Sequence, residues 1–124
     1  MEKVYTKHAP DAIGPYSQAV KTGNLLFTSG QIAICPESGR VEAGDIVGQT
    51  EQVCKNLGAV LAAAGTDFAH VVKTVCFLAD MNDFAVFNEI YGRYFVSKPA
   101  RSCVAAKSLP KGVLVEVELV AELS

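Results

Sequence analysis

Arg101 and two glutamates farther along the chain, Glu116 and Glu118, are the side chains best suited to hold a small charged molecule. A guanidinium keeps its charge and grips a carboxylate through two parallel hydrogen bonds. Cys103 lies two residues after Arg101, so both side chains point to the same side of a strand. Each feature also has a simpler interpretation. Arg101 can be an ordinary surface arginine, Cys103 a small buried thiol, and the two glutamates part of a solvated polar face. The backbone N–H of Cys103 is a further donor, independent of the thiol.

These side chains gather on one surface if the two C-terminal strands form a hairpin. The segment Leu109–Gly112 has proline second and glycine fourth, as tight turns favour. Ser108 then lies opposite Val113, and the face that carries Arg101 and Cys103 also carries both glutamates. A slip of one residue would reverse this arrangement. The pattern therefore predicts a cation, a thiol and two carboxylates on one face of the sheet.

Further polar candidates lie in irregular segments among the first thirty residues. Tyr16 follows Gly14 and Pro15, and its phenol is either a surface ring or a hydrogen-bond partner for a ligand. Ser29 and Gly30 end a predicted strand, where a hydroxyl and an amide can approach a ligand or simply form a turn. The chain contains no nucleotide-binding, zinc-protease or serine-hydrolase motif. These residues alone do not define a reaction.

Composition and charge argue against several classes of protein. Lys plus Arg total 11 and Asp plus Glu total 13, and the cations are scattered, which does not favour a nucleic-acid partner. The four cysteines are never closer than 19 positions, so the close pairs typical of structural zinc are missing and no metal is expected. No apolar run approaches the roughly 20 residues that span a bilayer, and the chain starts without an apolar leader. We therefore expect a cytoplasmic protein with free thiols and no membrane contact.

The element pattern predicts one folded domain over residues 1–124. Apolar residues make up 50% of the chain and charged residues 19%, which excludes a disordered chain. The predicted strands cover residues 3–7, 17–21, 25–29, 70–78, 101–107 and 113–123, and residues 35–44 form a loop.

Two helices are predicted between these strands. Asp45 is a suitable N-cap and Gly65 a suitable C-terminal glycine for a helix over residues 46–64. Asn82 or Asp83 caps a second helix, which ends before a proline at position 99. An aromatic stripe on this second helix is interpreted as core packing.

The order of these elements predicts an α+β domain with one antiparallel or mixed six-stranded sheet and two helices on one face. Two helices cover only one face of six strands, so the opposite face must meet solvent or other subunits. In the last strand, Leu114 and Val120 share the face of the glutamates, which indicates that this face is not fully solvated.

Eight segments along nearly the whole chain form a recognisable combination. They are AIGPYSQA (12–19), TSGQI (28–32), VVKT (71–74), LADMNDF (78–84), FNEIY (87–91), PARSCV (99–104), LPKG (109–112) and VEVE (115–118). In this order they closely resemble the RidA/YjgF family of reactive-intermediate (enamine/imine) deaminases. The segment Val96–Lys98 departs from the family, because it looks short and has lysine where the family often has phenylalanine.

This resemblance implies a chorismate-mutase-like α+β fold and a homotrimer whose sheets pack into a central barrel. It implies active sites in clefts between subunits and no cofactor. The implied reaction is the hydrolytic deamination of 2-aminoacrylate and related enamines and imines to 2-keto acids and ammonia. Such compounds are released by pyridoxal-phosphate enzymes, which the reaction protects from damage.

The resemblance also implies roles for individual residues. Arg101 binds the substrate carboxylate, helped by the backbone N–H of Cys103 and by the Ser29–Gly30 segment. Glu116 orients or activates the attacking water. Tyr16 and Asn88 line the pocket, with the tyrosine near the leaving nitrogen.

Two other functions remain open on the sequence. A non-catalytic regulator or chaperone-like protein that binds small keto or amino acids would use the same arginine pocket. Ribonuclease activity or translation inhibition is also attributed to members of this family, although the acidic pI of about 5.6 and the scattered cations do not favour it. Turnover with ammonia release separates an enzyme from a binder, and fold alone does not decide.

Overall fold

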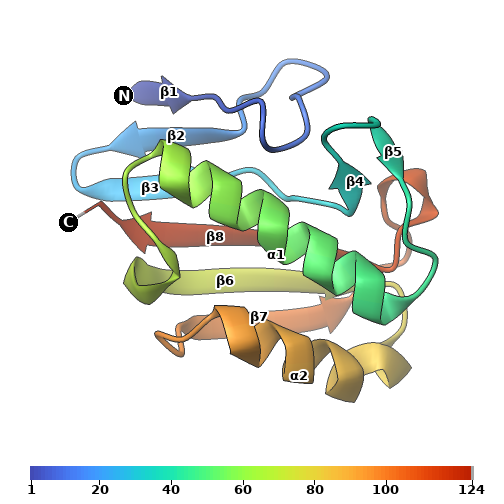
Figure 1. Ribbon diagram of the computed structural model, residues 1–124. Helices are drawn as coiled ribbons and strands as arrows, with labels where there is room; N and C mark the ends of the chain where they lie inside the picture. The colour runs from blue at the N-terminus through green and yellow to red at the C-terminus, as the bar shows by residue number, and fades with distance from the viewer. Residues whose placement is uncertain (124) are drawn as a thin grey trace.

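A six-stranded sheet with two helices on one face forms the protein (Figure 1). The computed structural model describes residues 1–123, so Ser124, the last residue of the predicted domain, lies outside the described residues. The strand order is β1-β2-β3-β8-β6-β7, in which only β6 and β7 run parallel. The strands are β1 (Glu2–Val4), β2 (Ala19–Thr22), β3 (Leu25–Thr28), β6 (Val71–Leu78), β7 (Ala100–Ala105) and β8 (Val115–Glu122). The predicted α+β class is confirmed.

The helices begin at side-chain caps. Helix α1 (Ile46–Ala63) starts at Asp45, whose Oδ1 accepts the N–H of Gly48 at 2.8 Å, as predicted. It ends before Gly65, which has a positive φ of 83°. Helix α2 (Phe84–Tyr94) follows a 3-10 turn and ends earlier than predicted.

The predicted cap of this second helix is confirmed in position, because Asp83 is the N-cap residue of α2. The side chain of Asp83 makes no capping hydrogen bond with the helix. Asp80 caps the 3-10 turn instead, because its Oδ1 accepts the N–H of Asn82 at 2.9 Å. The 3-10 turn is a separate capped segment directly before α2. Residue types that favour caps do not show where the turn ends and the helix begins.

Strand β8 lies at the centre of the sheet and carries the core. Its residues alternate between buried and half-buried along Val115–Glu122, as the pattern predicted. The buried side packs beneath α1, and the deepest core side chains come from both layers. They include Val53, Leu57, Val60, Leu61, Leu78, Phe87, Phe95, Val115 and Val117.

The predicted hairpin of the two C-terminal strands is wrong, because β6 lies between β7 and β8. Arg101 is in register with Thr74 and, through it, with Leu119, which is buried beneath the helices. Glu116 lies an odd number of positions from Leu119. Arg101 and Cys103 therefore share the helix-covered face, and both glutamates lie on the other. The physical reason is the crossover through α2, which returns the chain parallel to β6 and occupies that edge.

Two smaller predictions also need correction. The loop predicted over residues 35–44 contains a two-stranded ribbon of β4 (Ile34–Cys35) and β5 (Arg40–Val41). The first strand covers Glu2–Val4 rather than residues 3–7. Both elements are very short, so they leave little periodicity in the sequence.

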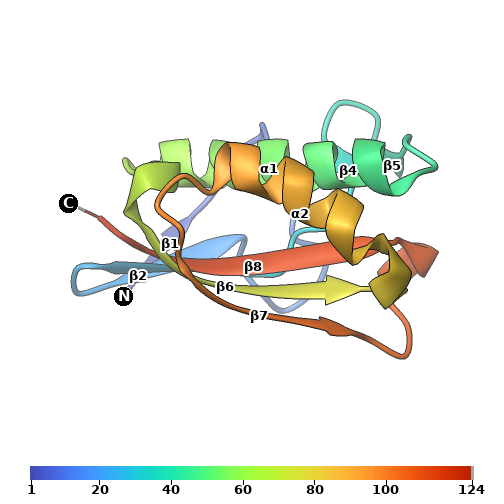
Figure 2. The same cartoon turned by 90° about the horizontal axis from the view of Figure 1, so that it is seen from below.

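Within residues 1–123, no helix or strand covers the face of the sheet that is turned away from α1 and α2 (Figure 2). Apolar side chains reach this face beside the glutamates, as predicted, and Val104 is 50% exposed. The apolar side chains on this face are those of Phe27, Val75, Phe77, Val104 and Val120. Neither helix described in residues 1–123 has the length and apolar character needed to cross a membrane.

Candidate functional site

Arg101 is held near the start of β7 by side chains of α2. Its Nη1 donates to Asn88 Oδ1 at 2.7 Å. The guanidinium carbon lies 4.9 Å from the ring centroid of Tyr91 and 5.4 Å from that of Phe84. Together with Lys98, it lines a cavity of about 630 Å³, called the arginine cavity below. The full lining of the arginine cavity is Tyr91, Gly92, Phe95, Val96, Lys98, Pro99 and Arg101.

Among the residues that the structure describes, no acidic side chain compensates the charge of Arg101. Arg93 on the same helix shows the contrast, because its guanidinium lies 3.2 Å from Glu89 and 3.8 Å from Glu51. Within residues 1–123, no carboxylate lies within ion-pair distance of Arg101, and Asn88 is its only hydrogen-bond acceptor. A guanidinium has five N–H donors, so donors are left over for a ligand. The arginine cavity is thus built to receive an anion.

Cys103 follows Arg101 on the same face of β7 and is in register with Cys76 of β6. Burial raises the pKa of Cys103, which the positive charge of Arg101 lowers to a smaller extent. Burial also raises the pKa of Cys76, to about 12. Both thiols are therefore protonated and weakly nucleophilic at neutral pH.

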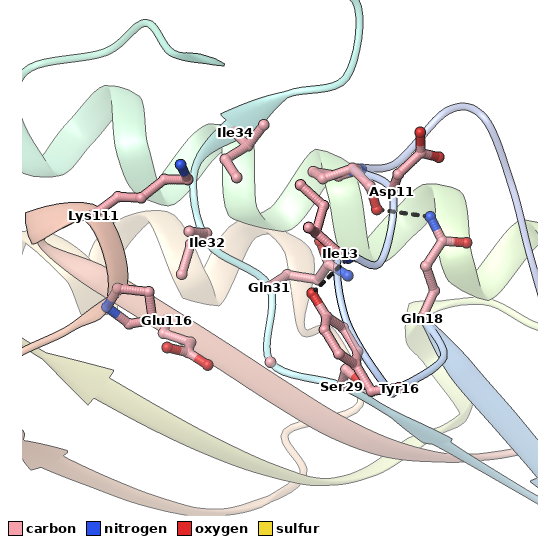
Figure 3. A pocket seen from close by; sticks show the side chains of 13 residues that line it. Asp11, Ile13, Tyr16, Gln18, Ser29, Gln31, Ile32, Ile34, Lys111 and Glu116 are labelled. Atoms are coloured by element: carbon pink, nitrogen blue, oxygen red, sulfur yellow. Dashed lines mark hydrogen bonds between the residues drawn. The ribbon is translucent and has the colours of Figure 1, made fainter. Parts of the chain in front are cut away.

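Glu116 lines a second cavity of about 450 Å³, called the glutamate cavity below (Figure 3). Tyr16, Ser29 and Gly30 line the same cavity, so four of the predicted site residues are brought together. Burial raises the pKa of the Glu116 carboxyl, and the nearby charge of Glu118 raises it further. A carboxyl whose pKa moves toward neutrality exchanges protons more readily near pH 7.

Gly30 allows the Glu116 carboxyl to lie directly against the backbone. A Cβ at position 30 would lie 2.9 Å from Glu116 Cδ and closer still to Oε2. The adjoining residue, Gln31, fixes this junction, because it exchanges backbone hydrogen bonds with Val117 at 2.9 and 3.2 Å. Residue 30 must therefore lack a side chain for the carboxyl to keep its position.

The rest of this cavity wall is made of loops secured by buried amides. Tyr16 is 54% exposed, and its phenol oxygen accepts the N–H of Ile13 at 3.4 Å (Figure 3). Ser29 Oγ donates to the carbonyl of Ser17 at 2.6 Å. The buried side chain of Gln18 donates to the carbonyls of residues 6, 9 and 10 and accepts the N–H of residue 6. These bonds hold the tyrosine-bearing loop on the sheet.

Sequence reasoning missed part of the glutamate cavity. Lys111, Ile32 and Ile34 line it and were not predicted as site residues. Asn56 on α1 donates from Nδ2 to the carbonyls of Ile32 and Ile34, at 3.1 and 3.0 Å. The turn that carries Lys111 was recognisable, but its position beside this cavity depends on tertiary structure that the turn signal does not encode.

In one chain, the two cavities remain separate. Arg101 lines one and Glu116 the other, and no lining residue is shared. Asn88 and Cys103 lie with the arginine, whereas Tyr16 and the Ser29–Gly30 segment lie with the glutamate. Within the described part of the chain, no cluster of three or more His, Cys, Asp or Glu side chains is arranged to hold a metal ion.

Comparison with known proteins gives a consistent family assignment. The family model described as Endoribonuclease L-PSP matches residues 6–123. The chain is 52% identical to a RutC family protein of Pyrococcus horikoshii, over 97% of this chain and 96% of that protein. It is 50% identical to the mouse protein named 2-iminobutanoate/2-iminopropanoate deaminase, over 95% of this chain and 88% of that protein.

A solved structure supports the same assignment. The crystal structure of E. coli TdcF with bound serine matches with a TM-score of 0.95 and 40% identity, over 100% of both chains. The predicted fold and the predicted family are therefore confirmed by independent comparisons. Since the family model spans nearly the whole described chain and includes both cavities, the protein belongs to the Endoribonuclease L-PSP family, also called the YjgF/RidA family.

Proposed function

We propose that this protein hydrolyses small enamines and imines that carry a carboxylate, such as 2-aminoacrylate and 2-iminopropionate, to 2-keto acids and ammonia. The observation that carries this proposal is the guanidinium of Arg101, which lines a cavity and has no acidic partner within the described part of the chain. The name of the mouse relative, 2-iminobutanoate/2-iminopropanoate deaminase, supports the same substrate class. By removing such compounds, the protein limits damage to the pyridoxal-phosphate enzymes that release them.

Arg101 binds the substrate carboxylate in this proposal. Two of its free N–H groups hold the two carboxylate oxygens, while Asn88 keeps the guanidinium in place. The backbone N–H of Cys103 is a further donor on the same strand face. E. coli TdcF was crystallised with serine, an amino acid that carries such a carboxylate. Fixing the acid end in this way orients the reacting carbon for attack.

Glu116 acts as the general base for water. An enamine first tautomerises to an imine, whose C2 atom is electrophilic. Water adds to C2 while Glu116 accepts one of its protons, and the raised pKa of this carboxyl suits the transfer near neutral pH. Glu116 passes this proton to the nitrogen, which completes the carbinolamine. The proton of the carbinolamine hydroxyl then passes to the nitrogen as the C=O double bond forms, the C–N bond breaks, and ammonia leaves beside Tyr16. The net reaction consumes one water and forms one keto acid and one ammonia.

The two halves of this site come from different copies of the chain in our proposal. Arg101 and Glu116 line separate cavities of one chain, so one small substrate does not reach both. Strand β7 lies at the edge of the sheet, and the helix-free face carries exposed apolar side chains such as Val104. A homotrimer packed through this face would place the edge of one chain against the glutamate cavity of the next.

Subunit complementation tests the shared site. Arg101→Ala and Glu116→Gln are each expected to retain no more than about 1% of wild-type activity alone. After unfolding and refolding as an equal mixture, about a quarter of the sites combine an intact arginine with an intact glutamate, if subunits assemble at random head to tail. Partial recovery of imine hydrolysis in the mixture is expected. No recovery in mixed assemblies shown to form would place both residues of each site on one chain.

Turnover separates this proposal from its alternatives. A pyridoxal-phosphate dehydratase generates 2-aminoacrylate from serine, and keto-acid release is followed with and without the protein. Acceleration is expected, whereas binding of pyruvate without acceleration would indicate a non-catalytic regulator. The family description names a ribonuclease, so RNA cleavage is assayed on the same preparations.

The cytoplasmic location remains a prediction, supported by four free cysteines among the described residues.

A further inference from the structure

Two aromatic rings of α2 lie against the guanidinium of Arg101 without neutralising it. The ring centroids of Tyr91 and Phe84 lie 4.9 and 5.4 Å from its Cζ atom. A cation is attracted to the face of an aromatic ring within about 6 Å. An aromatic ring carries no net charge, so it holds the cation while leaving its positive field available. A carboxylate in the same place would hold the arginine and also compete with an anionic ligand.

The ring of Tyr91 is itself fixed on several sides. Its hydroxyl lies 2.7 Å from Oγ1 of Thr74, the residue directly across from Arg101 on β6. The ring stacks on Phe95 at a centroid distance of 4.2 Å and contacts Phe87 at 5.4 Å. Tyr91 is only 8% exposed. The support beneath the arginine therefore belongs to the rigid core rather than to a mobile surface.

Tyr94 shows that this arrangement is particular to one side of the helix. Tyr94 lies three residues after Tyr91 and donates its hydroxyl to Glu51. Its ring packs on Phe68 at 5.7 Å, and no contact with Arg101 is present among the described residues. Two tyrosines on one helix thus have different surroundings, and only one of them supports the arginine.

We propose that Tyr91 and Phe84 are positioning residues that hold Arg101 in the orientation required for carboxylate binding. This inference rests on the proposed function and deepens it, because it assigns the precision of carboxylate recognition to two side chains that act through the guanidinium of Arg101. Their loss gives the long arginine side chain rotameric freedom that each binding event must then remove. The expected defect is in affinity rather than in the chemical step.

The test compares Tyr91→Leu and Phe84→Leu with Tyr94→Leu as the matched control. Pyruvate, a keto-acid product, serves as the binding probe in calorimetry, and 2-iminopropionate generated in situ serves as the substrate. Tyr91→Leu is expected to raise KM and the pyruvate Kd about 10-fold, with kcat changed less than about threefold. Phe84→Leu, at the longer distance, is expected to show a smaller rise. Tyr91→Phe keeps the ring and is expected to rescue most of the affinity.

A structural defect would give a different result, because partial unfolding lowers the active fraction and kcat while KM stays constant. The proposal is overturned if Tyr91→Leu and Phe84→Leu leave KM and Kd unchanged, or if Tyr94→Leu raises them equally. Phe84 is only half-buried, so its variant stays informative if Tyr91→Leu does not fold.

A readout independent of activity separates this inference from the proposed function. Aromatic rings shift the NMR signal of a nearby proton, so the Arg101 Nε–Hε resonance, assigned with Arg101→Lys, is expected to move in Tyr91→Leu and not in Tyr94→Leu. An unmoved resonance would overturn the positioning role. If the wild-type protein neither binds pyruvate nor hydrolyses imines, the proposed function fails, while the resonance still tests the contact.

Discussion

The arginine cavity and the glutamate cavity position their key side chains by different physical means. Arg101 rests on regular secondary structure, between a strand and the aromatic side of α2. Glu116 also comes from a strand, but the walls around it are loops secured by the buried amides of Gln18 and Asn56. In the proposed mechanism, carboxylate binding therefore depends on a rigid core, whereas the position of the Glu116 carboxyl depends on loops and on the absent Cβ at Gly30.

Removal of the guanidinium should have the largest effect. Arg101→Ala is expected to lower kcat/KM for 2-iminopropionate about 1000-fold, because the substrate carboxylate loses its guanidinium partner. Arg93→Ala is the matched control, since Arg93 is exposed and already paired with two glutamates. Light scattering should show the same assembly for both variants. Near-wild-type turnover by Arg101→Ala would contradict the assignment of the carboxylate site.

Neutralising the carboxyl of the other cavity should have the next largest effect. Glu116→Gln is expected to lower kcat about 100-fold, because the water loses its general base, while the pyruvate Kd stays near the wild-type value. Glu118→Gln is the control on the same strand face. Loss of pyruvate affinity with unchanged kcat would show instead that Glu116 contributes to binding.

A methyl group at position 30 should act through Glu116. Gly30→Ala is expected to lower kcat about 10-fold, because the new Cβ displaces the flexible carboxyl of Glu116 without a clash with the backbone. In a Glu116→Gln background, the same substitution should have little further effect, which a double-mutant cycle measures. Additive losses would show that the two residues act independently.

The raised pKa of Glu116 predicts a pH-dependent change in stability. The folded protein binds the proton of this carboxyl more tightly than the unfolded chain does. The contribution of Glu116 to the free energy of unfolding therefore falls as pH rises through the folded-state pKa of its carboxyl. Glu116→Gln should therefore raise Tm at pH 7, by no more than about 4 °C, and the gain should vanish near pH 3. Calorimetry at both pH values checks the sign, and a lower Tm at pH 7 would contradict it.

The smallest effect is expected for the thiol nearest the arginine. Cys103→Ala keeps the backbone N–H and the strand, and the thiol is protonated at neutral pH because burial raises its pKa. Activity should therefore stay within about threefold of wild type. A loss of activity of 100-fold or more would show that the sulfur takes part in the chemistry. The arginine cavity would then supply a reacting group as well as a binding group, as the glutamate cavity does.

Local signals predicted the elements well but not their neighbours. The α1 boundaries followed from Asp45 and Gly65, because caps act over a few residues. The faces of β7 and β8 were assigned wrongly relative to each other, since adjacent strands in sequence were assumed to pair. The two strands are joined by a turn, yet β6 lies between them. The alternation of side chains along a strand assigns residues of two strands to the same face only when the neighbouring strands in the sheet are correctly identified.

The candidate site shows the same limit. Family resemblance named Arg101, Glu116 and the other site residues, but their distribution between two cavities required the coordinates. The contact between Gly30 and Glu116 joins positions 86 residues apart, and no spacing rule predicts it. The aromatic stripe of α2 was correctly predicted to pack in the core. Its second role, as support for a cation, becomes visible only once β7 lies beside the helix.

The ring beneath Arg101 also has an optical consequence. The chain has no tryptophan and only four tyrosines, so its ultraviolet emission comes from very few rings. Tyr91 lies in the arginine cavity and Tyr16 in the glutamate cavity, whereas Tyr94 donates its hydroxyl to a carboxylate. Changes in tyrosine fluorescence are therefore expected to follow occupancy of either cavity without a label, and Tyr16→Phe is expected to assign the signal to one of them.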